Sequence, residues 1–448
     1  MRNHILTLSL VGAVACGDDG GNLQPDGAAP LPDAATDAAI DAPPDAPPAT
    51  CTPAAMRTDL AWHGTNRADL TAWLGTHGCT SAGYDAARKP VALFDWDNTV
   101  GKNDFGDAIT FYMIKESKVL QPPAQDWKAT SAYMTDAAAA ALTAACGTTV
   151  AAGQPLPTGT NTACADEMLS IYINGTTSAT APTPNAAAFA GHNYRYLEPT
   201  YAWTAQLLAG YTHAEIQGFA TAAIGPQLTA AVDAVQTVGT RTNLNGWLRI
   251  YDQVKDLIAV TQSHGYDVWV ITASPQDVIQ TFAPMVGIPA DHVIGIRSKT
   301  DSNGKLTYRF EGCGTVADDT QSMITYIQGK RCWVNKIVFG DATAAAMQRR
   351  PDGMRQIFAA GDSDTDIEFL RDAQYRLVIN RGKKEIMCHA YYNSFDRWRV
   401  NPMFLQPRAA GSTYTCSTNA CKNEAGVSGP CRDDAGNIIP DLPDSVHP

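Results

Sequence analysis

The sequence predicts an α/β fold built on a parallel sheet, because short apolar segments alternate with segments of helical periodicity. We interpret four apolar segments as buried strands: residues 90–97, 265–274, 356–366 (with 336–340 as an alternative) and 376–380. Helical spacing is found in a lead-in at 56–78 and between the strands, at 246–265 and 274–287. Helices should therefore cover both faces of the sheet, and ligands should bind beyond the carboxyl ends of its strands.

A long insertion separates the first two strands. Residues 108–245 are too many for one crossover, and they include the alanine-rich run "TDAAAAALTAAC". We expect a mainly helical cap over the active site, with a lateral domain as the alternative. The core would comprise 51–107 and 246–407, followed by a Cys-rich tail at 408–448, which we interpret as a disulfide-stapled appendage. The insertion also carries the aromatic residues Tyr112, Trp127, Tyr133, Tyr172, Tyr194, Tyr196, Tyr201 and Trp203.

The N-terminal segment indicates export. Arg2 precedes a short apolar run, and small residues precede Cys16, so residues 1–16 resemble a bacterial lipoprotein signal; an ordinary cleaved secretory signal is the alternative. Residues 17–50 are mostly Asp, Ala, Pro and Gly and should form a disordered tether, because they contain few large apolar side chains. We therefore expect a cell-envelope protein held to the outer membrane, on its periplasmic or surface face, by a lipid on Cys16.

The cysteines agree with an oxidising compartment. Setting Cys16 aside, ten cysteines remain, and these should mostly form disulfides. Local pairing is the simplest guess, although connectivity does not follow from sequence: Cys51–Cys79, Cys146–Cys164 and Cys313–Cys332. A zinc site is the alternative for Cys416, Cys421 and Cys431, but these residues form no CxxC pair and have no adjacent histidine.

The overall charge argues against nucleic acid as a partner. The formal net charge is -12, and the sequence contains no basic stripe that would attract a phosphate backbone. A small anionic substrate remains compatible with this charge if cations are placed locally.

Two aspartates end the first predicted strand. Asp95 and Asp97 should face the same side, because side chains alternate along a strand, while Trp96 faces the other. A bound divalent cation would relieve the repulsion between the carboxylates, which could then act as nucleophile and general acid/base. The alternative for an isolated pair of this kind is a turn cap.

Further polar residues follow the later strands. Thr272 could bind a phosphoryl oxygen or cap the next helix, and Asp362 and Asp366 suit a hard cation such as Mg²⁺ or a surface turn. Lys336 lies between them in sequence, where a charge-neutralising lysine would be expected, and Lys330 is the second choice. Either lysine could instead be an ordinary surface residue.

In their order and spacing these four segments resemble the motifs of the haloacid dehalogenase-like (HAD) hydrolase superfamily. The likeness covers residues 90 to 405 and is strongest to phosphoserine phosphatase and phosphorylcholine phosphatase, which implies a Rossmann-like core with an inserted C1-type cap. It implies that Asp95 forms an aspartyl-phosphate, that Asp97 is the acid/base, and that Thr272 and Lys336 hold the phosphoryl group. It also implies that Asp95, the Asp97 carbonyl and Asp362 bind Mg²⁺, supported by Asp366.

The resemblance also suggests a substrate site. Thr99, Asp104 and Asp107 follow the first motif and should contact substrate, and the cap aromatics could hold a quaternary ammonium group by cation–π attraction. The expected activity is Mg²⁺-dependent hydrolysis of a small phosphomonoester, with phosphorylcholine and phosphoserine as candidates. The alternatives are a phosphotransferase or mutase on the same scaffold, and a non-catalytic lipoprotein that uses the fold for surface binding.

Overall fold

The computed structural model describes residues 51–448, which form one compact unit. The predicted signal peptide at 1–16 and the tether at 17–50 lie outside the described residues. None of the helices between residues 51 and 448 is both long and apolar enough to span a membrane.

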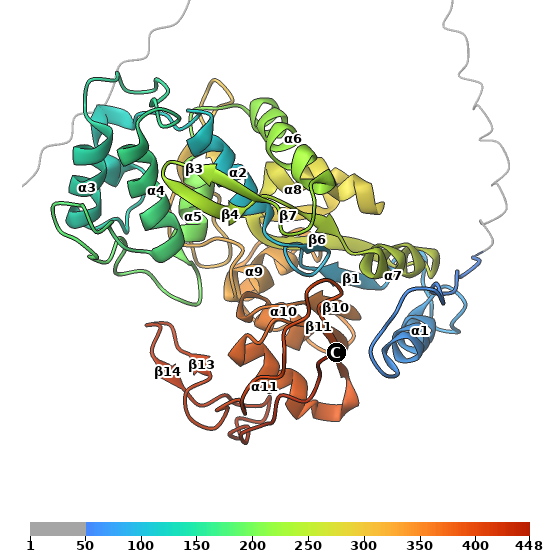
Figure 1. Ribbon diagram of the computed structural model, residues 1–448. Helices are drawn as coiled ribbons and strands as arrows, with labels where there is room; N and C mark the ends of the chain where they lie inside the picture. Colours follow the sequence, from blue (N-terminus) through green and yellow to red (C-terminus); the bar gives the residue numbers. More distant parts are fainter. Residues whose placement is uncertain (1–50) are drawn as a thin grey trace, which may run out of the picture. The chain divides into compact units, whose positions relative to one another are not determined.

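The secondary structure alternates between helices and strands along the chain (Figure 1). The helices are α1 (Asn66–His77), α2 (Phe105–Lys115), α3 (Asp136–Cys146), α4 (Thr162–Asn174), α5 (Pro199–Gln206), α6 (His213–Thr229), α7 (Asp252–Ser263), α8 (Gln276–Phe282), α9 (Gln328–Ile337), α10 (Ile367–Asp372) and α11 (Lys384–Tyr392). The strands of the main sheet are β1 (Val91–Phe94), β6 (Asp267–Pro275), β7 (Val293–Ile296), β10 (Phe358–Gly361), β11 (Tyr375–Asn380) and β12 (Trp398–Pro402). Short strands pair in hairpins or isolated ribbons: β2 (Gly101–Lys102), β3 (Val235–Val238), β4 (Arg241–Asn245), β5 (Arg249–Ile250), β8 (Ser298–Thr300), β9 (Leu306–Phe310), β13 (Cys421–Lys422) and β14 (Ser428–Gly429).

The main sheet is entirely parallel, with strand order β12-β11-β10-β1-β6-β7. The predicted α/β class is therefore confirmed. The chain leaves β1 toward β6 and β7 on one side and later returns to β10, β11 and β12 on the other. The order thus reverses at β1, and the crevice at the carboxyl end of such a switch point is where open parallel sheets bind ligands.

Two apolar cores lie on the two faces of this sheet. Alternation along β1 places Ala92 and Phe94 in one core and Val91 and Leu93 in the other. The first core contains the apolar faces of α1, α2, α7 and α8, and the second contains those of α9, α10 and α11. Each fully buried side chain such as Phe94 contributes roughly 1.5–3 kcal/mol, so the two cores together hold the sheet rigid beneath its carboxyl edge.

The four predicted strands correspond to β1, β6, β10 and β11, whereas β7 and β12 are additions. The strand β12 has the sequence WRVNP and lies at the edge of the sheet. It contains too few apolar residues to form the apolar run from which a strand is predicted. The alternative segment 336–340 forms no strand: it comprises the last two residues of α9 and the turn that follows. The predicted lead-in helix is shorter than expected, because the chain adopts a positive φ of 51° at Gly64 before α1 begins.

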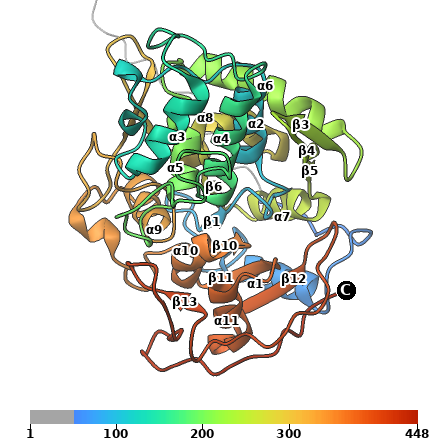
Figure 2. The same ribbon diagram turned by 60° about the vertical axis from the view of Figure 1, so that its left-hand side comes forward.

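The insertion at 108–245 is mainly helical. It holds most of α2, all of α3 to α6, and the β3–β4 hairpin. Figures 1 and 2 show α3, α4 and α5 gathered in the upper part of the view, with α11 and β13 in the lower part. The division into core, cap and tail stays a prediction, since the described residues form a single compact unit.

Five disulfides join the ten cysteines of the described chain. The predicted local pairs Cys51–Cys79, Cys146–Cys164 and Cys313–Cys332 are confirmed. Of the remaining pairs, Cys388–Cys416 joins α11 to the tail and Cys421–Cys431 lies within the tail. This density of disulfides is typical of an extracytoplasmic protein.

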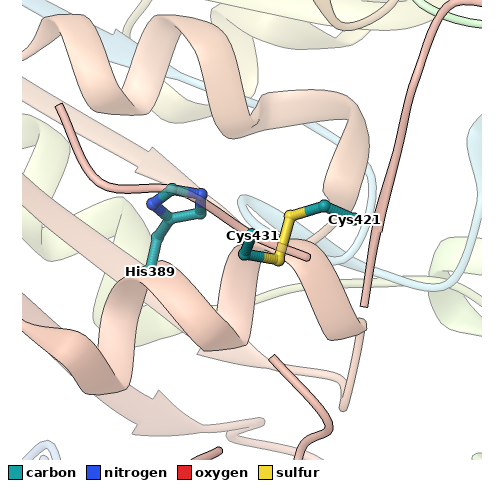
Figure 3. Close-up of side chains that lie close together, drawn as sticks. All are labelled: His389, Cys421 and Cys431. Carbon is teal, nitrogen blue, oxygen red and sulfur yellow. A yellow bond between two sulfur atoms is a disulfide. The ribbon is translucent and has the colours of Figure 1, made fainter. Parts of the chain in front are cut away.

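The tail cysteines do not form a zinc site. His389 lies near Cys421 and Cys431, but the two sulfur atoms are bonded to each other (Figure 3). No thiolate is therefore present to bind a metal, which agrees with the preference for disulfides.

The Cys146–Cys164 bridge joins the C-terminal end of α3 to the first turn of α4, and both side chains are buried. Replacing both cysteines by alanine should lower the free energy of unfolding by about 2–4 kcal/mol, because the unfolded chain gains conformational entropy when the cross-link is removed. Chemical denaturation checks this, with far-ultraviolet circular dichroism confirming that the variant folds. An unchanged unfolding midpoint would contradict the expectation.

Candidate active site

The first motif forms a tight turn directly after β1. The N–H of Asp95 donates to the Ala360 carbonyl at 2.9 Å, which extends the pairing of β1 with β10 by one residue. The Trp96 carbonyl then accepts from the N–H groups of Thr99, Val100 and Gly101 at 3.3, 2.9 and 3.0 Å. Asn98 has a φ of 62°, a left-handed conformation that asparagine tolerates better than most residues. Asn98 is therefore a turn residue, a role that its sequence context did not reveal.

Asp95 and Asp97 both face the pocket beyond the sheet edge, as predicted. Asp95 accepts from Lys330 Nζ at 2.6 Å and from Thr99 Oγ1 at 3.2 Å. Asp97 accepts from the N–H of Phe105 at 2.8 Å and from Ser274 Oγ at 2.7 Å. Trp96 is fully buried and packs edge-on against the Phe105 ring, 5.5 Å away.

Asp362 and Asp366 come to the same place from the neighbouring strand β10. Asp366 Oδ2 accepts from the N–H groups of Asp362 and Ser363, each at 3.0 Å. This requires glycine at 361, because a Cβ there would lie 2.8 Å from the Asp366 carboxylate. One oxygen from each of Asp95, Asp362 and Asp366 lies within 4.8 Å of the others, and all three residues are buried.

The structure corrects the prediction that Lys336 is the charge-neutralising lysine of the site. Lys330, the second choice, is completely buried and donates to Asp95 Oδ1 and Asp366 Oδ1, both at 2.6 Å. Lys336 instead donates to the Gly312 carbonyl at 2.8 Å and lies over the Trp333 ring, away from the carboxylates. The two lysines are six residues apart on α9, a spacing that places them on different sides of the helix.

The hydroxyl group on β6 that contacts the pocket belongs to Ser274. Thr272 is fully buried, and its Oγ1 lies 3.5 Å from Asp97 Oδ2, farther than Ser274 Oγ. The Thr272 hydroxyl also accepts from the Ser274 N–H at 3.1 Å. Ser274 was missed, although alternation along the strand places it on the same side as Thr272.

Thr99 lies behind the carboxylates rather than in the pocket wall. It is fully buried, and its Oγ1 lies 3.2 Å from Asp95 and 3.1 Å from Asp362. The structure thus corrects its expected place in a substrate site: Thr99 holds these two carboxylates in position.

The insertion closes the pocket with aromatic side chains. Tyr172 of α4 and Tyr201 of α5 line it together with Asp104, whereas Trp127 and Trp203 belong to the core. The Tyr172 hydroxyl donates to Asp107 at 2.5 Å, so Asp107 contacts the pocket wall through this phenol. The free volume is only about 40 Å³, enough for little more than one or two water molecules.

Arg381 is a pocket residue that was not predicted. It follows β11, and its Nη1 donates to Asp362 Oδ2 at 2.7 Å. Arg381 could have been predicted because it directly follows the predicted strand 376–380, and polar residues at the carboxyl ends of parallel strands gather at the ligand site.

The site carries more negative than positive charge. Among residues 51–448, two basic residues, Lys330 and Arg381, and five aspartates surround it; the aspartates are Asp95, Asp97, Asp104, Asp362 and Asp366. Burial raises the pKa of Asp95 well above its usual range, and Asp366 raises it further against the opposing effect of Lys330. Burial likewise raises the pKa of Asp97, with Asp104 adding to it. Buried carboxylates in excess, converging on one point, fit a divalent cation held by oxygen ligands.

Residues 202–371 match the family of haloacid dehalogenase-like hydrolases. The matched stretch includes Thr272, Lys330, Asp362 and Asp366, and it begins after Asp95. Among curated proteins, none matches the sequence.

Several solved structures are similar to this chain. A conserved protein of unknown function from Anaerococcus prevotii is 18% identical with a TM-score of 0.54, and the match covers 77% of this chain and 93% of that one. A protein of unknown function from Bordetella pertussis is 16% identical, covering 70% and 98% of the two chains, with a TM-score of 0.40. A phosphoserine phosphohydrolase-like protein from Francisella tularensis is 13% identical, covering 65% and 87%, with a TM-score of 0.31. The first likeness supports the fold, and the family match over residues 202–371 agrees with the converging motif residues in its similarity to haloacid dehalogenase-like hydrolases.

Proposed function

We propose that the protein is a Mg²⁺-dependent phosphomonoesterase that cleaves small phosphorylated metabolites through an aspartyl-phosphate on Asp95. The observation that carries the proposal is the convergence of Asp95 and Asp97 on one pocket beside the buried carboxylates of Asp362 and Asp366. A second aspartate two residues after the first supplies the proton transfer that ester cleavage needs.

In the first step an Asp95 carboxylate oxygen attacks phosphorus, and the bond to the ester oxygen breaks. Asp97 donates its proton to that leaving oxygen, and the raised pKa of Asp97 favours its protonated form. In the second step Asp97 accepts a proton from water, and the oxygen of that water attacks the phosphorus. Inorganic phosphate leaves, and the Asp95 carboxylate is restored.

Lys330 orients the nucleophile and opposes the rise in its pKa. Its ammonium group contacts both Asp95 and Asp366 at 2.6 Å and would also face charge that develops on the phosphoryl oxygens. Asp95, the Asp97 backbone carbonyl and Asp362 would hold Mg²⁺, with Asp366 in support. The ion would supply charge neutralisation for the transferred group.

The pocket wall favours a substrate with a cationic body, such as phosphorylcholine or phosphoserine. Asp104 and Asp107 lie on the cap side, and the phenol rings of Tyr172 and Tyr201 are adjacent. A carboxylate and aromatic rings together attract an ammonium group. With about 40 Å³ free, admission of such a substrate requires movement of side chains on this side.

Export and membrane attachment remain part of the proposal. The five disulfides support an oxidising compartment. Cleavage before Cys16 and its lipidation would hold the enzyme at the cell envelope, with small phosphorylated molecules rather than nucleic acid as its partners.

Replacing Asp95 by asparagine should lower phosphate release by more than about 10³-fold, because the amide is a poor nucleophile. The measurement is phosphate release from a panel of small phosphomonoesters, with Mg²⁺ and after metal removal. The wild type should lose activity without metal and regain it when Mg²⁺ is added. The exposed Asp291→Asn variant is the matched control and should retain full activity. Equal activity of the Asp95 variant and the wild type, or activity of neither on any ester, would refute the proposal.

Lys330→Met should lower kcat by roughly 10²–10³-fold, since a buried charge that stabilises the phosphoryl group is lost. Lys336→Met, a change of the same chemistry on the same helix, should leave kcat within about twofold of the wild type, because its side chain contacts Gly312 and Trp333 outside the pocket. Circular dichroism should show both variants folded. A larger loss in the Lys336 variant would reverse the assignment.

Preference for a cationic substrate should rise with pH. Burial, with Asp104 nearby, raises the pKa of Asp107 to about 7, so this carboxyl gains its negative charge as pH increases from 6 to 8. The ratio of kcat/KM for phosphorylcholine to that for 3,3-dimethylbutyl phosphate, an isostere that lacks the positive charge, should rise about tenfold over this range. Titration of Asp97 affects both substrates and cancels in the ratio. In Asp107→Asn the ratio should be flat; a ratio in the wild type that is independent of pH would exclude the cationic site.

A further inference from the structure

A second cavity lies at the opposite edge of the main sheet from the active site. Its walls include residues 355–357 before β10, 373–374 before β11 and 394–398 at the start of β12. The pocket residues Asp362 and Arg381 follow the carboxyl ends of β10 and β11 instead. The six residues of β11 span roughly 20 Å, so the two cavities are separate.

This cavity is basic in an acidic protein. Its lining contains six arginines and four aspartates, whereas the whole chain has a formal net charge of -12. The arginines are Arg349, Arg350, Arg355, Arg371, Arg376 and Arg397. Its volume of about 560 Å³ is within the range of small-molecule sites.

The aspartates of the lining already have partners. Asp434 accepts from Arg349 at 2.7 Å and from Arg371 at 2.6 Å. Asp372 accepts two bonds from Arg331, whose side chain is not part of the cavity lining. Arg355 contacts the exposed carboxylate of Asp352, and Arg350 Nη1 lies 3.7 Å from Asp341 Oδ2. Among the described residues, Arg376 and Arg397 are therefore the arginines of the lining without a carboxylate partner.

Several donors of the lining remain unused within residues 51–448. Arg355 Nη1 is buried without a hydrogen-bond partner. Arg397 makes no ion pair there, and its side chain is exposed to the cavity mouth. His389, only 6% exposed, also lines the cavity, and its ring forms no hydrogen bond within this part of the chain (Figure 3).

The cationic side chains also crowd one another. Arg376 is buried over the Trp398 ring, with its Nε and Nη2 donating to the carbonyls of Leu370 and Arg371. Burial, together with the positive charge of Arg349, lowers the pKa of Arg376 to about 9. An anion in the cavity would relieve this repulsion and satisfy the unused donors.

We propose that this cavity is a second ligand site, which binds a small molecule bearing clustered oxyanions such as a diphosphate. Guanidinium groups match the planar edges of phosphate groups with paired hydrogen bonds. Arg355, Arg376 and Arg397 approach from three different segments and can contact separate oxygens. The exposed ring of Phe395 and the indole of Trp398 provide apolar surface for the body that carries the phosphates.

The probe is methylenediphosphonate, which carries two phosphonate groups and has no ester bond to hydrolyse. Binding is measured by isothermal titration calorimetry at neutral pH and low salt, on the full folded protein freed of divalent metal with a chelating resin. Under these conditions the acidic active site disfavours the anion. The wild type should bind one equivalent, and Arg397→Gln and Arg355→Gln should each weaken binding about tenfold.

Two controls distinguish the cavity from the rest of the molecule. Arg309→Gln, which removes an exposed arginine outside both cavities, and Lys330→Met, in the active site, should leave the affinity within about twofold. Thermal unfolding should show the arginine variants folded, as expected for side chains without a buried ion pair. The proposal is overturned if the wild type does not bind, if Arg397→Gln and Arg355→Gln bind as the wild type does, or if Lys330→Met abolishes binding.

Discussion

The active site depends on one buried ammonium group held between two carboxylates. Lys330 touches Asp95 from the end of β1 and Asp366 from the turn after β10, so a single side chain joins the two halves of the site. Removing either partner of such a buried pair leaves an uncompensated charge, which costs about 3–5 kcal/mol. The first turn of α9, the turn after β1 and the turn after β10 must therefore keep their relative positions for the site to exist.

The sheet supplies that constraint. Because β1 and β10 are adjacent and parallel, their carboxyl ends meet, and the N–H of Asp95 continues the ladder to Ala360. Apolar cores on both faces hold these strands, and Gly361 lets the Asp366 carboxylate approach the backbone. The acidic residues can thus be concentrated in one place, and the repulsion that results makes the site receptive to a metal ion and to a proton on Asp97.

The same strands connect two regions of opposite charge. Carboxylates gather where the strands end, and arginines gather where β10, β11 and β12 begin. The helix α10 runs from Asp366 in the acidic site to Arg371 and Asp372 beside the basic cavity. Glu368 on this helix is held by Arg195 and Arg331, so α10 is anchored by ion pairs to the insertion and to α9. The contacts of both regions therefore depend on the position of one short helix.

The sequence by itself determined the parallel α/β fold, four of its six central strands and the aspartates of the site, because these depend on local periodicity and on residues that directly follow a strand. It also indicated three of the five disulfides, which close short loops. Only the tertiary structure decided between Lys330 and Lys336, since both occur on one helix and the choice depends on which side of α9 faces β1. Ser274, Arg381 and the two tyrosines of the pocket were likewise decided by packing, because they come from four separate elements. The basic cavity has no motif at all: its arginines are spread over nearly fifty residues and meet only where three strands begin.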